Sequence, residues 1–231
     1  MAPRQHLPAG APRRGFTLVE VLVALAVMAL LAVLSWRGLD GMARAQAQTR
    51  ERADQVLALQ AGLAQWTADL ENAVQLPQVA ALDWDGRGLR LTREAGDEGL
   101  RVVCWTRRET ATGAQWLRWQ SPPLRGRGEW AAAWAQAAQW AQNPGALERR
   151  YEVAIAPLAQ WQLFFFRGNA WTNPLSSAGA PAAPGPGAAP AGGDTGMPDG
   201  VRLILDLPAG QAIAGTLTRD WVRPTLGGGK S

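Results

Sequence analysis

The stretch from Arg13 to Trp36, RRGFTLVEVLVALAVMALLAVLSW, constrains the chain more than any other part of it. A helix from Phe16 to Trp36 would be roughly 31 Å long, which matches the ~30 Å hydrocarbon core of a bilayer. The two arginines before it predict that the N-terminus stays in the cytoplasm and that the later residues are exported. We therefore expect a single-pass membrane helix over residues 16–36.

One ionisable side chain, Glu20, interrupts the apolar stretch. A charge within a spanning helix costs about 2.5–3.5 kcal/mol on insertion scales, so its presence there needs a reason. A cleaved secretory signal would have a shorter apolar core, followed by small residues at the cleavage site. Here Trp36, Arg37 and Gly38 follow the apolar run, so we expect the helix to be retained.

Residues 15–20, Gly-Phe-Thr-Leu-Val-Glu, resemble the processing motif of type IV prepilins and type II secretion pseudopilins. The resemblance implies that a prepilin peptidase cuts between Gly15 and Phe16 and methylates the new amine of Phe16. It also implies an assembly role for Glu20, whose carboxylate would pair with the cationic N-terminus of a neighbouring subunit in a low-dielectric surrounding. The other interpretation, a glutamate that faces an unrelated membrane partner, stays open.

Composition argues against several other classes of function. Three of the 23 basic residues, Arg4, Arg13 and Arg14, leave with the leader, so 20 remain against 19 acidic ones and no basic cluster for nucleic acid is left. The only histidine, His6, leaves as well, which excludes Ser-His-Asp and Cys-His catalysis and His-based metal sites. We expect no enzyme, no cofactor and no small-molecule substrate.

The only cysteine, Cys104, cannot form an intrachain disulfide, and its apolar neighbours predict a buried, inert thiol.

Periodicity predicts that the helix continues beyond the membrane. Residues 44–76 lack proline, and Pro77 would end the helix. Gly38 and Gly41 permit either a bend or a continuous helix that packs closely. An apolar stripe recurs at steps of three and four and comprises Val56, Leu59, Leu63, Trp66, Leu70 and Ala73.

After Pro77 the periodicity changes towards two, which predicts strands. Residues 88–93 and 100–107 indicate a hairpin, and further strands are expected over 114–120, 151–155, 161–165, 201–207 and 214–222. Residues 129–142 are rich in alanine and predict a second helix, whose tryptophans Trp130, Trp134 and Trp140 cannot share one face, so at least one should be exposed or at an interface. Residues 173–200 are rich in Pro, Gly and Ala and predict a mobile loop.

Two acidic turns, Asp83-Trp-Asp-Gly and Asp97-Glu-Gly, offer oxygen ligands for calcium, but they lack EF-hand spacing. Acidic residues are also common in turns because they hydrogen-bond to the local backbone, and we favour that interpretation. Trp105, Trp116, Trp161 and Trp221 lie in strand patterns and are expected in the core.

These features together predict an α+β, pilin-like fold, in which a long N-terminal helix, half transmembrane and half packed, lies against antiparallel β-sheets. The chain resembles most the J family of minor pseudopilins, which implies a structural role at the tip of the pseudopilus, in the inner membrane and periplasm, with pseudopilins of the I, K, H and G types as partners. A minor type IV pilin of the W type is the alternative, and a membrane-anchored periplasmic hydrolase is a third interpretation. The expected division is a leader over 1–15, a membrane helix over 16–36, a periplasmic helix over 37–76, a β-rich domain over 77–223 and a frayed tail over 224–231.

Overall fold

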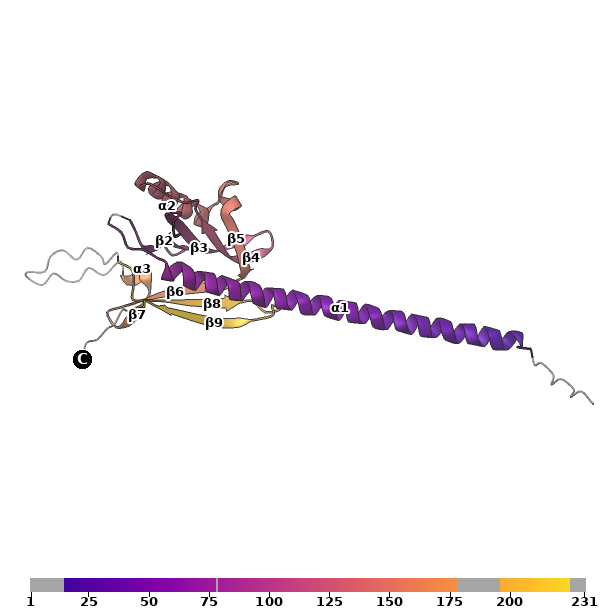
Figure 1. The fold of residues 1–231 in the computed structure, drawn as a ribbon. Helices are drawn as coiled ribbons and strands as arrows, with labels where there is room; N and C mark the ends of the chain where they lie inside the picture. Colours follow the sequence, from indigo (N-terminus) through magenta and orange to yellow (C-terminus); the bar gives the residue numbers. More distant parts are fainter. Residues whose placement is uncertain (1–14, 78, 178–195, 225–231) are drawn as a thin grey trace, which may run out of the picture. The chain divides into compact units, whose positions relative to one another are not determined.

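The computed structural model describes residues 15–77, 79–177 and 196–224 (Figure 1). The chain divides into two compact units, Met1–Glu51 and Arg52–Ser231. Among the described residues, one helix is long and apolar enough to cross a membrane: α1, Leu18–Glu71, whose most apolar window has a mean hydropathy of 2.7. The expected leader, apart from Gly15, lies outside the described residues.

Helix α1 is continuous through Gly38 and Gly41, so the bend that these glycines permit is not present. No side chain or backbone lies within 4 Å of the Cβ position of either glycine. Close packing against another described segment of the chain therefore does not explain these two glycines.

The end of α1 lies at Glu71, five residues before the end predicted at Leu76. The Asn72 N–H and side-chain amide both donate to the Ala68 carbonyl, at 3.1 and 2.8 Å. The Val74 N–H then donates to the Thr92 carbonyl at 3.0 Å. The chain thus leaves the helix because its backbone pairs with a strand before the proline is reached.

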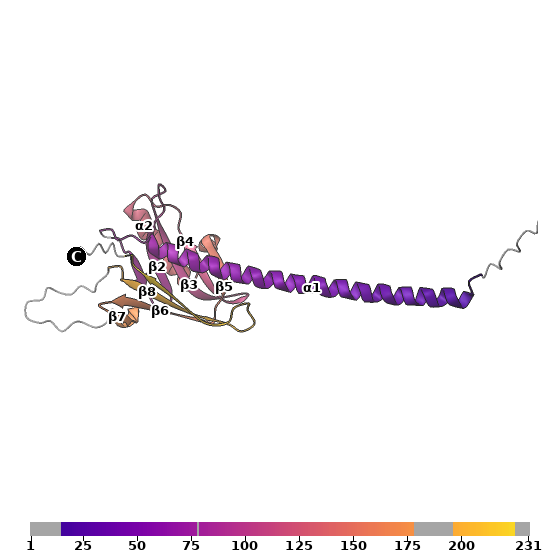
Figure 2. The same ribbon diagram turned by 60° about the horizontal axis from the view of Figure 1, so that its bottom comes forward.

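The second unit contains two antiparallel sheets (Figure 2). The five-stranded sheet has the order β1-β2-β3-β4-β5 and the four-stranded sheet the order β7-β6-β8-β9. The predicted hairpin is confirmed as β2–β3, and the other predicted strands are confirmed as β4, β5, β6, β8 and β9. The three-residue strands β1 and β7 were not predicted. The strands are β1 Leu82–Trp84, β2 Gly88–Glu94, β3 Leu100–Thr110, β4 Gly113–Gln120, β5 Glu152–Pro157, β6 Gln160–Arg167, β7 Ala170–Thr172, β8 Gly200–Leu207 and β9 Gly215–Val222.

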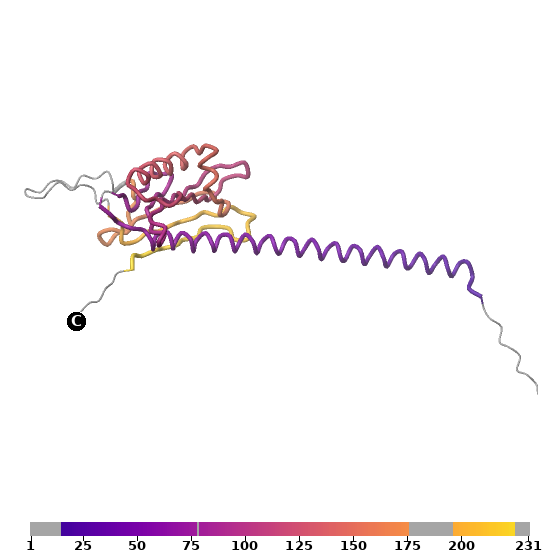
Figure 3. Tube along the Cα trace, turned by 45° about the horizontal axis from the view of Figure 1, so that its top comes forward, coloured from indigo at the N-terminus to yellow at the C-terminus, as the bar shows by residue number. Residues whose placement is uncertain are grey.

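Three further helical segments complete the second unit. Helix α2, Arg127–Gln142, confirms the predicted second helix and packs on the five-stranded sheet (Figure 3). A short 3-10 helix, η1, covers Glu148–Tyr151, and α3 covers Pro174–Ser177 within the predicted loop. The remainder of that loop, residues 178–195, and the predicted tail from 225 onwards lie outside the described residues.

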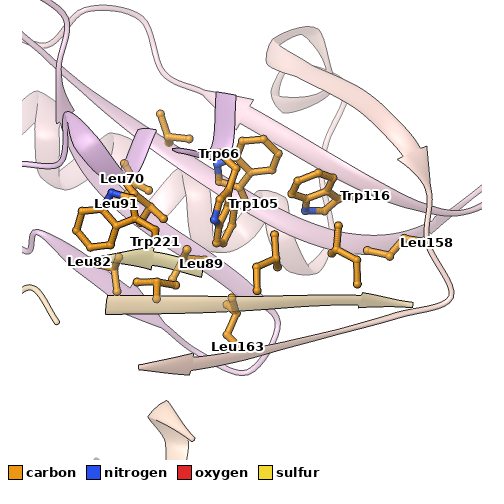
Figure 4. Packing of buried hydrophobic residues seen from close by; sticks show 14 of the residues in the cluster. Trp66, Leu70, Leu82, Leu89, Leu91, Trp105, Trp116, Leu158, Leu163 and Trp221 are labelled. Atoms are coloured by element: carbon orange, nitrogen blue, oxygen red, sulfur yellow. The ribbon is translucent and has the colours of Figure 1, made fainter. Parts of the chain in front are cut away.

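The main core lies where the C-terminal part of α1 meets both sheets. Trp66 and Leu70 of α1 are fully buried against Trp105 and Trp116 of the five-stranded sheet (Figure 4). The rings of Trp105 and Trp116 lie 4.6 Å apart between centroids, and Trp66 meets the Trp105 ring edge-on at 5.4 Å. The four-stranded sheet closes the core with Leu163, Phe165, Val201, Leu203, Leu205, Leu207 and Trp221.

A second, smaller core lies on the other face of the five-stranded sheet, beneath α2. It contains Val102, Cys104 and Leu117 from the sheet, and Ala137 and Trp140 from the helix. Alternate residues of β3 and β4 therefore face two different cores. This explains why those strands have apolar residues on both faces.

Gly62 is required where α1 approaches β5. A Cβ atom there would lie 2.2 Å from Ile155 Cγ2 and 3.3 Å from the Trp116 ring. We expect Gly62→Ala to lower the free energy of unfolding by about 1–2 kcal/mol, because overpacking costs more than alanine adds in helix propensity. Gly128→Ala in α2 is the matched control: its Cβ meets nothing within 4 Å, so it should leave stability unchanged or raise it by up to about 1 kcal/mol. Thermal unfolding of both variants measures the difference, and equal shifts would contradict the close approach.

Candidate functional site

The segment Gly15–Thr17 precedes the first turn of α1, which begins at Leu18. All three residues are non-helical, and Phe16 is 87% exposed. The peptide bond that the prepilin motif assigns for cleavage therefore lies in an exposed, non-helical part of the chain. Gly15, Phe16 and Thr17, which surround this bond, are all exposed among the described residues.

Thr17 and Glu20 form a reciprocal cap at the start of the helix. The Glu20 N–H donates to Thr17 Oγ1 at 3.3 Å, and the Thr17 N–H donates to Glu20 Oε2 at 2.9 Å. The Thr17 hydroxyl donates to the same carboxylate oxygen at 3.0 Å. This is the capping-box arrangement, which satisfies two backbone donors that a helix start otherwise leaves without partners.

The capping box gives Glu20 a function within its own chain, which the sequence analysis did not identify. The signal was present: a threonine followed three residues later by a glutamate, before an apolar run, is the capping-box pattern. A carboxylate at this position also interacts favourably with the positive end of the helix dipole.

The cap uses only one of the two carboxylate oxygens. Both donors converge on Oε2, and no described residue donates to Oε1 in any hydrogen bond of this segment. A carboxylate can accept up to about four hydrogen bonds, so Oε1 is available to a further donor. Capping and a contact with a second chain are therefore geometrically compatible.

Comparison with known protein families matches residues 11–36 to the prokaryotic N-terminal methylation motif. This match covers Gly15, Phe16 and Glu20 and most of the apolar part of α1. Together with a long helix packed on antiparallel sheets, it supports a pilin-like protein of the type II secretion and type IV pilus group. The motif implies processing by a prepilin peptidase and assembly with other pilin-like subunits, and it indicates a structural, non-enzymatic protein.

A second polar cluster lies at the other end of α1 and was not predicted at all. Asp69 is completely buried, and its two oxygens accept hydrogen bonds from four side chains. Arg118 donates through Nε at 2.8 Å and Nη2 at 2.9 Å, and Arg93 donates through Nη1 at 2.6 Å. The Trp105 indole and the Gln65 amide donate at 2.9 and 2.8 Å.

This Asp69 cluster joins the helix to three strands of the five-stranded sheet, because three of its four donor residues come from β2, β3 and β4, and the fourth, Gln65, comes from α1 itself. A buried carboxylate is tolerated only when its oxygens are well hydrogen-bonded and its charge is paired. Both conditions hold here, since two guanidinium groups contact it. We interpret the cluster as structural: it fixes where the helix sits on the sheet.

The acidic turns are explained by local hydrogen bonds and ion pairs. Asp85 Oδ1 accepts the N–H groups of Arg87 and Gly88 at 2.9 and 2.8 Å. Asp83 forms an ion pair with Arg90, and Glu98 forms one with Arg101. Among the described residues, no group of three or more acidic, cysteine or histidine side chains is arranged to hold a metal ion.

Cys104 is completely buried in the core beneath α2, as predicted. Burial raises the pKa of its thiol well above the ordinary value, because the thiolate would lose its hydration. The thiol is therefore unreactive in the folded protein.

The three tryptophans of α2 are buried to different extents, and the interface contact expected for at least one of them stays a prediction. Trp140 is completely buried, and its indole donates to Glu152 Oε2 at 2.7 Å. Trp130 and Trp134 are half-buried and stack on each other at 5.3 Å. Of the four strand tryptophans predicted in the core, Trp105, Trp116 and Trp221 are buried and Trp161 is half-buried against it.

Proposed function

We propose that this protein is a minor pseudopilin of the J type in a type II secretion system. In this role it would be a structural subunit at the tip of the pseudopilus, assisting assembly and protein export across the outer membrane. The observation that carries the proposal is the methylation motif at residues 11–36, which opens a helix packed on antiparallel sheets. Its size, about 216 residues after processing, and the presence of Glu20 favour the J type over smaller pseudopilins and over those without this glutamate.

The proposed arrangement has residues 16–36 in the inner membrane, the N-terminus in the cytoplasm and residues 37–223 in the periplasm. The arginines at positions 13 and 14 support this orientation, because basic residues favour the cytoplasmic side of a spanning helix. The partners would be pseudopilins of the I, K, H and G types. Residues 1–15 would be removed as the leader.

Mass spectrometry of the purified mature protein tests the processing. We expect a chain that begins at Phe16 and carries one methyl group on its N-terminal amine. The exposed, non-helical position of Gly15–Thr17 supports access of a peptidase to this bond. A chain that begins at Met1, or one cut after the apolar run, would overturn the pilin-like interpretation.

Deletion of the gene distinguishes the two machines that share the motif. Loss of exported proteins from the medium, with surface pili intact, supports the pseudopilin. Loss of pili with export intact supports the alternative, a minor type IV pilin of the W type. Complementation with the full chain controls for effects on neighbouring genes.

A further inference from the structure

Strand β5 and the 3-10 helix before it carry the densest group of exposed apolar side chains in the described part of the second unit. Leu147 is 64% exposed, Tyr151 48% and Val153 56%. Two exposed arginines, Arg149 and Arg150, lie between them in the sequence. We call these five residues the β5 edge surface.

The charge of this surface is positive. Neither Arg149 nor Arg150 forms an ion pair with any described residue. Of the two neighbouring carboxylates, Glu152 pairs with Arg108 at 2.6 Å, whereas the half-buried Glu148 accepts the neutral Gln136 amide of α2 at 3.4 Å and keeps its negative charge. The two guanidinium charges therefore outnumber the one carboxylate charge that has no ion pair, and the surface is net positive.

The backbone beside this surface is open. Strand β5 is the last in the order of its sheet, and no described strand pairs with its outer edge (Figure 1). Its pairing with β4 is regular over Glu152–Ala154, and the register shifts only beyond Ala154. Proteins usually protect an open edge with charges, prolines or bulges, because it offers unpaired N–H and C=O groups to another chain. Here Pro157 and the register shift protect only the second half of the strand.

The outer edge of β9, at the end of the four-stranded sheet, carries different side chains. Strand β9 also has no described neighbour on its outer side, but its exposed side chains are mainly threonines and charges, and Val222 is its one strongly exposed large apolar residue. Of these two long edges, as far as the described residues show, β5 alone combines clustered apolar side chains with arginines that form no ion pair.

We propose that the β5 edge surface binds an extended, acidic segment of another protein, which adds as a sixth strand beside β5. Backbone hydrogen bonds along Glu152–Ala154 would supply the affinity, as in other cases of strand addition. Val153 and Tyr151 would contact apolar side chains of the added strand, and Arg149 and Arg150 would select carboxylates. An anionic membrane surface would bind the same arginines, but it would not pair with an open strand edge. This proposal does not depend on the proposed function.

The test uses the full chain in neutral phosphatidylcholine nanodiscs, with a fluorophore attached through Val153→Cys. Labelling is selective because Cys104 is the only native cysteine and is buried. The probes are peptides about six residues long, the usual length of a strand, of alternating valine and glutamate or alternating valine and lysine. A third probe is the acidic peptide with alternate amides N-methylated, which cannot donate backbone hydrogen bonds along one edge.

We expect saturable binding of the acidic peptide with a dissociation constant below about 1 mM, and at least about tenfold weaker binding of the lysine and N-methylated peptides. Arg149→Glu with Arg150→Glu should reverse the preference between acidic and basic peptides. The matched controls are the label at Val222→Cys on β9, which should not respond, and Arg219→Glu, a charge reversal on β9, which should leave binding at position 153 unchanged.

Four results would overturn the proposal. They are no saturable response to the acidic peptide, equal binding of its N-methylated form, an equal response of the label on β9, and a response of the label at position 153 to phosphatidylglycerol in the nanodisc without any peptide. The last result would assign the surface to anionic lipid instead of a strand.

Discussion

Replacing Asp69 with alanine is expected to lower the free energy of unfolding of the β-rich unit by about 3–5 kcal/mol. The variant leaves the guanidinium groups of Arg93 and Arg118 without their buried acceptor, and the Trp105 indole loses its hydrogen bond as well. A typical domain is stable by only about 5–15 kcal/mol, so this loss would leave a substantial unfolded fraction at elevated temperature. Urea unfolding of the full chain in detergent, followed by near-ultraviolet circular dichroism of the tryptophans, measures it.

Asp83→Ala is the matched control. Asp83 also forms an ion pair with an arginine of the same sheet, but its side chain is 42% exposed. Exposed pairs contribute about 0–1 kcal/mol, so this variant should unfold nearly as the unmodified chain does. If Asp69→Ala lost no more stability than Asp83→Ala, the Asp69 cluster would not fix the helix on the sheet.

Glu20 variants should separate the capping function from the proposed assembly function. Glu20→Gln keeps a side-chain oxygen that can accept the Thr17 N–H, since glutamine also serves in capping boxes, but it removes the charge. Glu20→Ala removes both. We expect both variants to stay in the membrane and to co-purify with partner subunits at least about tenfold less than the unmodified chain, because an intersubunit ion pair in low dielectric is worth more than ~1.4 kcal/mol.

Recovery of partners by affinity purification after mild solubilisation measures this effect. Glu51→Gln, a charge removal at an exposed position on the same helix, is the control and should not change recovery. If Glu20→Gln recovered partners normally while Glu20→Ala did not, helix capping alone would explain the glutamate. Normal recovery with both variants would remove Glu20 from assembly altogether.

Much of the fold could be predicted because it follows from short-range pattern. The apolar stripe of α1 is confirmed: Leu59, Trp66 and Leu70 are buried, and Leu63 packs against the same core. The strands with alternating apolar residues are likewise confirmed, because apolar residues at every second position, with turn residues on either side, indicate a strand. A helix long and apolar enough to cross a membrane was predicted from its length and its single ionisable side chain, and it is confirmed as the N-terminal part of α1.

The features that were missed depend on contacts between distant parts of the chain. Asp69 looked like one polar residue on a helix face, and nothing in the sequence shows that Arg93 and Arg118 converge on it from 24 and 49 residues away. Strands β1 and β7 are too short to show a period, and their pairing partners define them. The end of α1 differs from the predicted end for the same reason. A backbone hydrogen bond from Val74 to the Thr92 carbonyl competes with a further helical turn.

The Asp69 cluster has a mechanical consequence for a chain of this kind. Its hydrogen bonds run sideways from α1 to neighbouring strands, so a pull along the axis of residues 52–71 loads them in shear. Bonds loaded in shear share the force and give way together, whereas bonds at the end of a segment open one after another. The four bonds that Arg93, Trp105 and Arg118 donate to this carboxylate, beside the edge-on rings of Trp66 and Trp105, would therefore resist extraction of the helix from between its sheets. A subunit that is pushed and pulled by its helix needs such an attachment at the end where the helix meets its folded domain.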